Sequence, residues 1–188
     1  FFYLKLGFSK TKKLFTIFFL ICLQGFIGWY MVASGLIDRV DVSHYRLSLH
    51  LVLAFIILSL IFWNYLEYKE IKVFGEKMNS RLAIIFLLLI FLQISIGAFV
   101  SGMDAGKIYN SWPLMGSSYF PDDALLINLL SFSAFNEPSL VQFIHRNLAY
   151  FIILLFSFIA TVIYRNKDFT YLRNITLLFC HMSTELIF

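Results

Sequence analysis

Four long apolar segments constrain this chain more than any other feature. They cover residues 14–33, 46–65, 82–101 and 140–164, and a further apolar stretch begins near residue 175. About 20 apolar residues are what a helix needs to cross the roughly 30 Å hydrocarbon core of a bilayer. Spanning segments must be helical, because an open strand edge leaves backbone groups unsatisfied in lipid. The sequence therefore predicts an all-α, polytopic transmembrane helical bundle with about four complete spans and a partial fifth.

The composition agrees with a lipid environment. Of all residues, 60% are hydrophobic and 14% are charged, whereas a soluble domain has about 45–50% apolar and about 25% charged residues. Cations flanking the spans explain the net charge of +4. The chain lacks the interleaving of basic and aromatic residues that binds nucleic acid. We therefore expect membrane lipid, and no nucleic acid, among its partners.

The distribution of basic residues predicts the orientation. Lysine and arginine concentrate in the segments 5–13, 69–81 and 165–173. The loops 34–45 and 102–140 carry one such residue each and several acids. By the positive-inside rule, the N-terminal end lies on the cytoplasmic or matrix side and these two loops face outward.

A sequence repeat divides the chain. The segment LQGFIG at residues 23–28 resembles LQISIG at residues 92–97. Each is followed by a Ser-Gly pair, an aspartate, an outer loop and a span with a histidine near its start, either His50 or His145. The repeat predicts two related half-bundles, residues 1–80 with two spans and residues 81–188 with two spans and the partial fifth. Such duplication is also common in transporters.

Each histidine has an arginine beside it. Arg46 precedes His50 by one helical turn, and Arg146 follows His145 directly. Imidazole is a common axial ligand of haem iron, and arginine pairs with carboxylates such as haem propionates. The alternative is a histidine that hydrogen bonds across helices beside an arginine that reaches the lipid head groups. The residues alone leave these two interpretations nearly equal.

Gln24 and Gln93 lie in the outer halves of their spans. Hydrogen bonding between helices is the favoured interpretation, and a polar contact to a cofactor is the alternative.

At these residues the chain resembles haem A synthase, a membrane enzyme of cytochrome oxidase assembly. The resemblance covers residues 24–146 almost without a gap. The matching blocks include QGFIGWYMV, SGL, VSHYRLSLHL, GMDAG, YNSWPLMG and QFIHR.

The resemblance implies an eight-helix architecture of two similar halves, each with a haem pocket held by two histidines. This chain resembles the third to sixth helices and the start of the seventh, so we expect an incomplete copy that is inactive alone. His50 and His145 are the expected iron ligands. The other expected cofactor-binding residues are Arg46, Arg146, Gln24 and Gln93. The family's early glutamate–histidine–arginine motif is not in this sequence, and no catalytic residue is assigned.

The implied reaction oxidises a ring methyl of haem O to a formyl group, giving haem A. Haem b is the implied cofactor and haem O the substrate, with haem sites near the outer face of the bacterial or mitochondrial inner membrane. Haem O synthase and cytochrome oxidase assembly factors are the implied partners, and a homo-oligomer is left open. Two alternatives remain: a non-catalytic di-haem electron-transfer protein of the cytochrome b type, and a repeat-built transporter.

Overall fold

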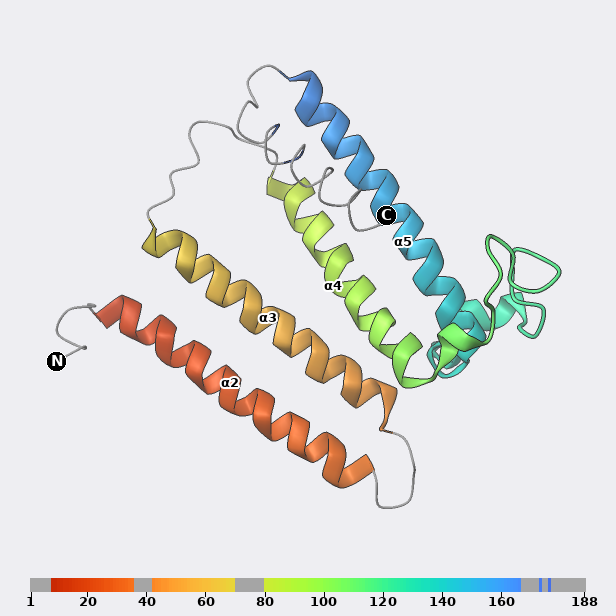
Figure 1. The fold of residues 1–188 in the computed structure, drawn as a ribbon, viewed down its shortest axis with the longest axis horizontal. Helices are drawn as coiled ribbons and strands as arrows, with labels where there is room; N and C mark the ends of the chain where they lie inside the picture. Colours follow the sequence, from red (N-terminus) through yellow and green to blue (C-terminus); the bar gives the residue numbers. More distant parts are fainter. Residues whose placement is uncertain (1–7, 36–41, 70–79, 167–172, 174–175, 177–188) are drawn as a thin grey trace. The chain divides into compact units, whose positions relative to one another are not determined.

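The computed structural model describes residues 8–35, 42–69, 80–166, 173 and 176. In these parts of the chain, the regular structure is entirely helical (Figure 1). The chain forms two compact units: residues 1–71 with 91–146, and residues 72–90 with 147–188.

Four long helices carry the apolar segments. They are α2 (Phe8–Gly35), α3 (His44–Tyr68), α4 (Ser80–Gly102) and α5 (Pro138–Arg165). All four are long and apolar enough to cross a membrane. The prediction of a polytopic helical bundle is thus confirmed, and the chain is an integral membrane protein. The partial fifth span falls almost wholly outside the described residues, and the division into half-bundles stays a prediction.

The helix ends follow from local chemistry. Pro138 opens α5 at a position where its missing N–H costs no hydrogen bond. Gly102 closes α4, where a Cβ would lie 3.0 Å from the Cα of His44 on α3. Ser48 of α3 is buried, and its hydroxyl donates to the carbonyl of Ser95 on α4 at 3.0 Å. Small side chains therefore let these helices approach closely, as is common in membranes.

Large apolar side chains lie mainly on the outside of the helices. Phe15, Phe18, Trp29 and Phe62 each have about 60% or more of their surface exposed in this chain. This pattern is expected where lipid is the solvent and apolar burial does not drive helix association.

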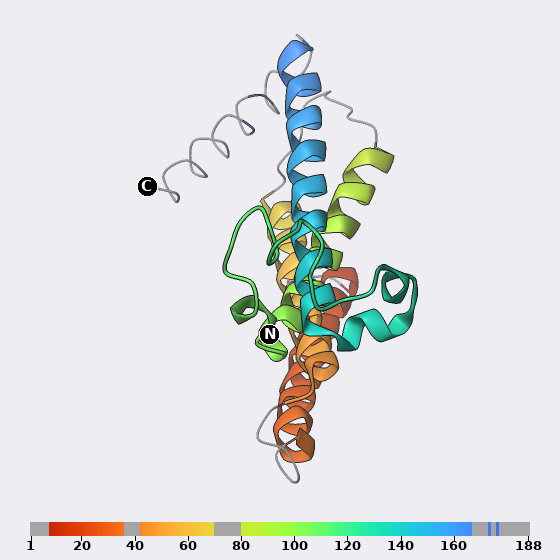
Figure 2. The same ribbon diagram turned by 90° about the vertical axis from the view of Figure 1, so that its right-hand side faces the viewer.

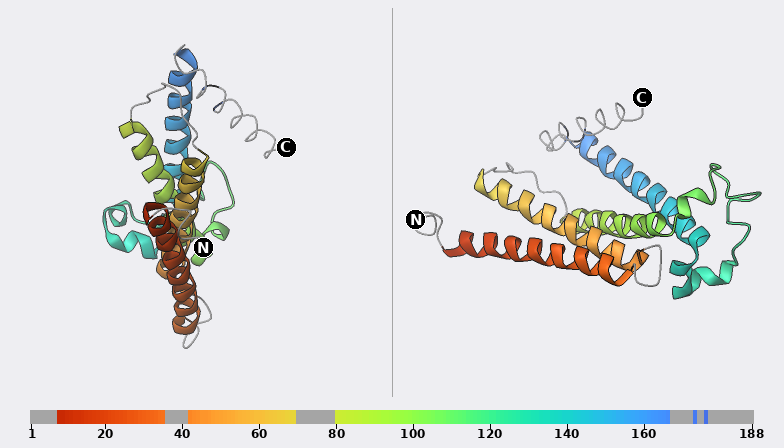
Figure 3. Two further views of the ribbon diagram at one scale, coloured as in Figure 1. Left: turned by 90° about the vertical axis from the view of Figure 1, so that its left-hand side faces the viewer. Right: turned by 60° about the horizontal axis from the view of Figure 1, so that its bottom comes forward.

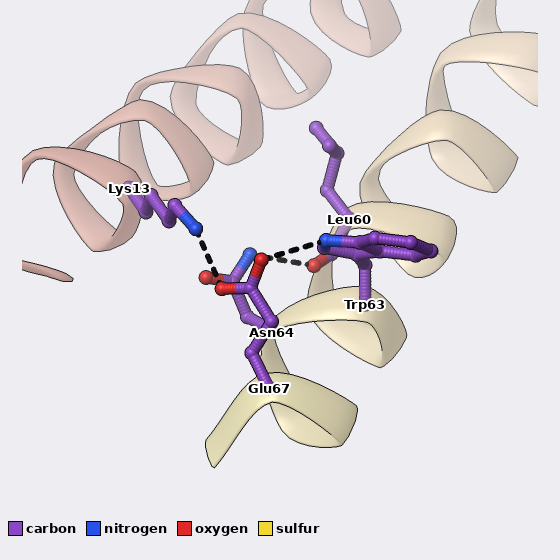
Figure 4. A network of polar contacts seen from close by, with 5 residues as sticks. All are labelled: Lys13, Leu60, Trp63, Asn64 and Glu67. Atoms are coloured by element: carbon purple, nitrogen blue, oxygen red, sulfur yellow. Dashed lines mark hydrogen bonds and ion pairs between the residues drawn. The ribbon is translucent and has the colours of Figure 1, made fainter. Parts of the chain in front are cut away.

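Helices α2 and α3 run side by side (Figure 3). Near one end of the pair, Lys13 of α2 forms an ion pair with Glu67 of α3. The indole N–H of Trp63 donates to the other oxygen of this carboxylate at 2.8 Å (Figure 4). A cavity of about 320 Å³ lies beside this network, lined mainly by apolar side chains such as Leu14 and Ile61. We call the end of the α2–α3 pair that carries Lys13 and Glu67 the basic end. The opposite end, nearest His50, is the histidine end.

The connection between α4 and α5 is folded into short turns (Figure 2). It contains three 3₁₀ helices: η1 (Ala105–Lys107), η2 (Leu126–Leu130) and η3 (Phe132–Asn136). Met115 is its most buried large side chain. Gly116 has φ +91°, and a Cβ there would meet a carboxylate oxygen of Asp122 at 2.1 Å. Only glycine fits this backbone without strain.

The second unit contains the rest of α4 and α5. There Phe86 of α4 and Phe156 of α5 stack with ring centroids 6.1 Å apart.

Candidate functional site

His50 lies in a cluster formed by α2 and α3. The side-chain nitrogen of Gln24 is 3.2 Å from His50 Nε2 and donates to the backbone carbonyl of His50 at 3.0 Å. Gly28 follows Gln24 by one turn, so both face the same neighbour. A Cβ at Gly28 would be 3.0 Å from the imidazole Cε1. The ring therefore lies directly against the glycine backbone.

His145 lies in a second cluster of the same design, formed by α4 and α5. The side-chain nitrogen of Gln93 is 3.3 Å from His145 Nε2 and donates to the carbonyl of His145 at 3.3 Å. A Cβ at Gly97 would be 3.1 Å from the imidazole Cε1. The repeated Leu-Gln-x-x-x-Gly pattern of the sequence thus builds the same contact twice. We call each set of glutamine, glycine and histidine a Gln–Gly–His cluster.

Both Gln–Gly–His clusters contain buried polar atoms that lack hydrogen bonds. Nδ1 of His50 and of His145 has no partner, and neither has Oε1 of Gln24 and of Gln93. Such atoms are costly in a finished core and call for a partner, such as a ligand, an ion or water.

The donor set indicates which group the clusters could hold. No group of three or more histidine, cysteine, aspartate or glutamate side chains gathers among the described residues. A bare metal ion needs several such ligands. A haem iron already has four ring nitrogens and takes single imidazoles as axial ligands. Single histidines are therefore compatible with haem ligation.

Arg46 is fixed to α2 at the histidine end. Its Nη1 donates to the hydroxyl of Ser34, which in turn donates to the carbonyl of Tyr30. The guanidinium carbon lies 5.1 Å from the centroid of the Tyr30 ring, a cation–π distance. The arginine thus stays near His50, one turn away along α3.

Arg146 binds the connection between α4 and α5. Its Nη1 donates to the carbonyl of Ser111 at 3.0 Å, and its Nη2 to the carbonyl of Tyr109 at 2.6 Å. The Tyr109 carbonyl also accepts from Gln142 Nε2 at 2.9 Å. We call this arrangement the loop clamp. Sequence reasoning missed Gln142, although its position one turn before His145 offered a signal.

The connection carries electrostatic contacts of its own. Hydrogen bonds from the backbone N–H and hydroxyl of Ser117 lower the pKa of the Asp122 carboxyl. The hydroxyl of Tyr109 donates to Asp123 at 2.7 Å, and this bond raises the pKa of the tyrosine. Tyr109 therefore joins the acidic part of the loop to the loop clamp.

Of the six site residues expected from the sequence, four form the two Gln–Gly–His clusters. The two arginines lie beside those clusters, each bound to a neighbouring segment. The roles of all six as cofactor contacts stay predictions.

Comparison with known proteins is consistent with this arrangement. Residues 2–186 match the family described as cytochrome oxidase assembly protein. The Heme A synthase of Pelagibacter ubique (strain HTCC1062) is 50% identical over 169 residues, which are 90% of this chain and 50% of that protein. The Heme A synthase of Rickettsia bellii (strain RML369-C) is 42% identical over 158 residues, 80% of this chain and 46% of that protein.

The Heme A synthase of Wolbachia pipientis wMel is 42% identical over 155 residues, 80% of this chain and 44% of that protein. The chain thus spans about half the length of the curated relatives it matches. No solved structure matches it. Because the family match extends over nearly the whole sequence, the chain belongs to the cytochrome oxidase assembly protein family.

Proposed function

We propose that this chain is part of an oxidoreductase that converts haem O to haem A for cytochrome oxidase biogenesis. The observation that carries the proposal is the Gln–Gly–His cluster, built twice with the same contacts. The names of the relatives support the choice of reaction.

In this proposal, His50 and His145 would each hold the iron of one haem, with haem b as cofactor and haem O as substrate. The bound haem iron supplies the oxidative chemistry. The protein would bind and orient the haems: glycine backbone lets each histidine ring lie directly against the neighbouring helix, and the apolar helices exclude water. Arg46 and Arg146 would bind the haem propionates in exchange for part of their present hydrogen bonds.

The proposed location is the inner membrane, with the histidine end facing outward. Haem O synthase, cytochrome oxidase assembly factors and a second copy of the chain are the proposed partners. The basic end carries Lys12 and Lys13, which agrees with a cytoplasmic or matrix position.

The proposal is tested by haem content. The chain is purified from cells supplied with haem precursor, alone and as the corresponding region of a full-length relative. His50→Ala and His145→Ala should each lower the bound haem, measured by absorption spectra. His44→Ala is the matched control, because His44 lies on α3 but outside both clusters. Haem content unchanged in both cluster variants would refute the proposal.

A non-catalytic di-haem protein of the cytochrome b type is the second candidate. The near identity of the two clusters favours it, because nothing in their geometry separates a substrate site from an electron-transfer site. Incubation of the full-length relative with haem O, followed by chromatography, separates the two functions. Haem A appears only if the protein is a synthase.

A further inference from the structure

The side-chain nitrogen of each cluster glutamine faces two atoms of one histidine. In the first cluster these are the carbonyl oxygen of His50 at 3.0 Å and the ring Nε2 at 3.2 Å. A backbone carbonyl can only accept, so the atom facing it must be the amide nitrogen and not the amide oxygen. One amide hydrogen therefore binds the carbonyl, and the second is available to the ring.

This geometry fixes where the imidazole carries its proton. A neutral imidazole has one nitrogen that donates and one that accepts. A hydrogen on Nε2 would point at an amide that is itself a donor, so Nε2 must be the accepting nitrogen. The ring proton then lies on Nδ1, the atom that has no partner in either cluster.

The second cluster repeats the same constraint. Gln93 Nε2 lies 3.3 Å from both the carbonyl oxygen and Nε2 of His145. Since the two clusters lie on different helix pairs, their shared geometry argues for a function beyond packing.

We propose that Gln24 and Gln93 are positioning residues that hold His50 and His145 in the tautomer whose Nε2 lone pair is ready to bind iron. The amide hydrogen occupies the lone pair before haem arrives, and the bond to the carbonyl keeps the glutamine attached to its histidine. This role rests on the proposed haem-binding function, because iron ligation is what gives the lone pair its use.

The decisive variant is Gln24→Glu. It nearly preserves shape, but an ionised carboxylate carries no hydrogen and only accepts. The ring nitrogen that faces it must therefore donate, which places a proton on Nε2. Gln93→Glu makes the same change in the other cluster, so each variant is the control for the other.

The tautomers can be measured without haem. The full chain, labelled with ¹⁵N-histidine and reconstituted haem-free in phosphatidylcholine bilayers, gives separate NMR signals for protonated and unprotonated ring nitrogens. His50→Asn and His145→Asn assign the signals. We expect unprotonated Nε2 at both histidines, a switch at His50 alone in Gln24→Glu, and a switch at His145 alone in Gln93→Glu. If Gln24→Leu also folds, it should give a mixture of tautomers at His50.

A protonated Nε2 in the unmodified chain, or no switch in either glutamate variant, would overturn the inference. Haem titration separates this failure from failure of the proposed function. Gln24→Glu should weaken haem binding at the His50 site about tenfold or more, because a charge-assisted hydrogen bond to the new carboxylate would hold a proton on Nε2. Haem binding by a chain with protonated Nε2 would leave the proposed function intact and refute the tautomer role. Correct tautomers without any haem uptake by the full-length relative would refute the proposed function and, with it, the role of the tautomer.

Discussion

At the scale of single residues, two glycines define how the histidines sit. Gly28 and Gly97 allow an imidazole ring to touch the helix backbone, whereas Gly25 has no atom within 4 Å of an added Cβ. The two glycines of the first span are therefore not equivalent, although they are only three positions apart. Contact with the ring, and not helix propensity, is what favours glycine at positions 28 and 97.

Substitution of Gly28 and Gly25 by alanine should separate the effect of the ring contact from the effect of helix propensity. In Gly28→Ala the new Cβ would lie 3.0 Å from His50 Cε1, so the ring must move and we expect a loss of about 1–3 kcal/mol in stability. Gly25→Ala should be neutral or stabilising by up to about 1 kcal/mol, because alanine favours helix. Unfolding in detergent micelles measures both. Equal stability of the two variants would contradict the ring contact.

Asp122 is a second residue whose role can be tested singly. Its hydrogen bonds from Ser117 hold its pKa below the ordinary value of 3.8. A carboxyl whose folded pKa is depressed contributes stability above its unfolded pKa, and this contribution is lost as the pH falls through the folded pKa. The loop should therefore become more protease-sensitive below about pH 4, within this window.

The control is Asp122→Asn, which cannot titrate. It should show higher cleavage of the loop at pH 6 and a smaller rise in cleavage toward pH 3 than the unmodified chain. A wild-type loop whose cleavage rate does not change between pH 6 and pH 3 would show that this carboxylate does not order it.

At the scale of elements, polar contacts join α2 to α3 near both ends of the pair. Hydrogen bonds also join the connection before α5 to α5 itself. The Lys13–Glu67 ion pair lies at the basic end, and the Gln24–His50 contact toward the histidine end. An exposed ion pair contributes little, typically below about 1 kcal/mol. The polar contacts between helices therefore fix rotation and register more than they add stability.

The loop clamp makes a specific prediction for Arg146. Arg146→Ala removes the donors to the carbonyls of Tyr109 and Ser111, so residues 105–123 should exchange amide hydrogens faster, by about tenfold. Arg46→Ala is the matched control, because Arg46 binds α2 and not this loop. Hydrogen exchange followed by mass spectrometry measures both. Unchanged exchange in Arg146→Ala would exclude the clamp as the element that orders the loop.

At the scale of the whole molecule, orientation in the membrane is the property that the basic residues predict. In a Cys22→Ser, Cys180→Ser background, Ser133→Cys should react with a membrane-impermeant maleimide added outside spheroplasts. Lys12→Cys, on the basic end, should react only after permeabilisation. The reverse pattern would mean that the histidine end faces the cytoplasm.

The sequence by itself determined that lipid surrounds the helices, how many complete spans there are, and which histidines are candidate ligands. A run of about 20 apolar residues matches the thickness of the hydrocarbon core. It must be a helix there, because every backbone hydrogen bond has to be satisfied within the segment. The repeat of Leu-Gln-x-x-x-Gly and the following histidines is equally visible in one dimension.

Only the tertiary structure decided which atoms meet. Gln24 and His50 are 26 residues apart, Gln93 and His145 are 52 apart, and Arg146 reaches carbonyls 35 and 37 residues away. These contacts depend on how each helix is rotated about its axis and how far it slides along its neighbour. Hydrophobic pattern does not set either quantity when a helix is apolar on nearly all sides, because lipid accepts every rotation almost equally.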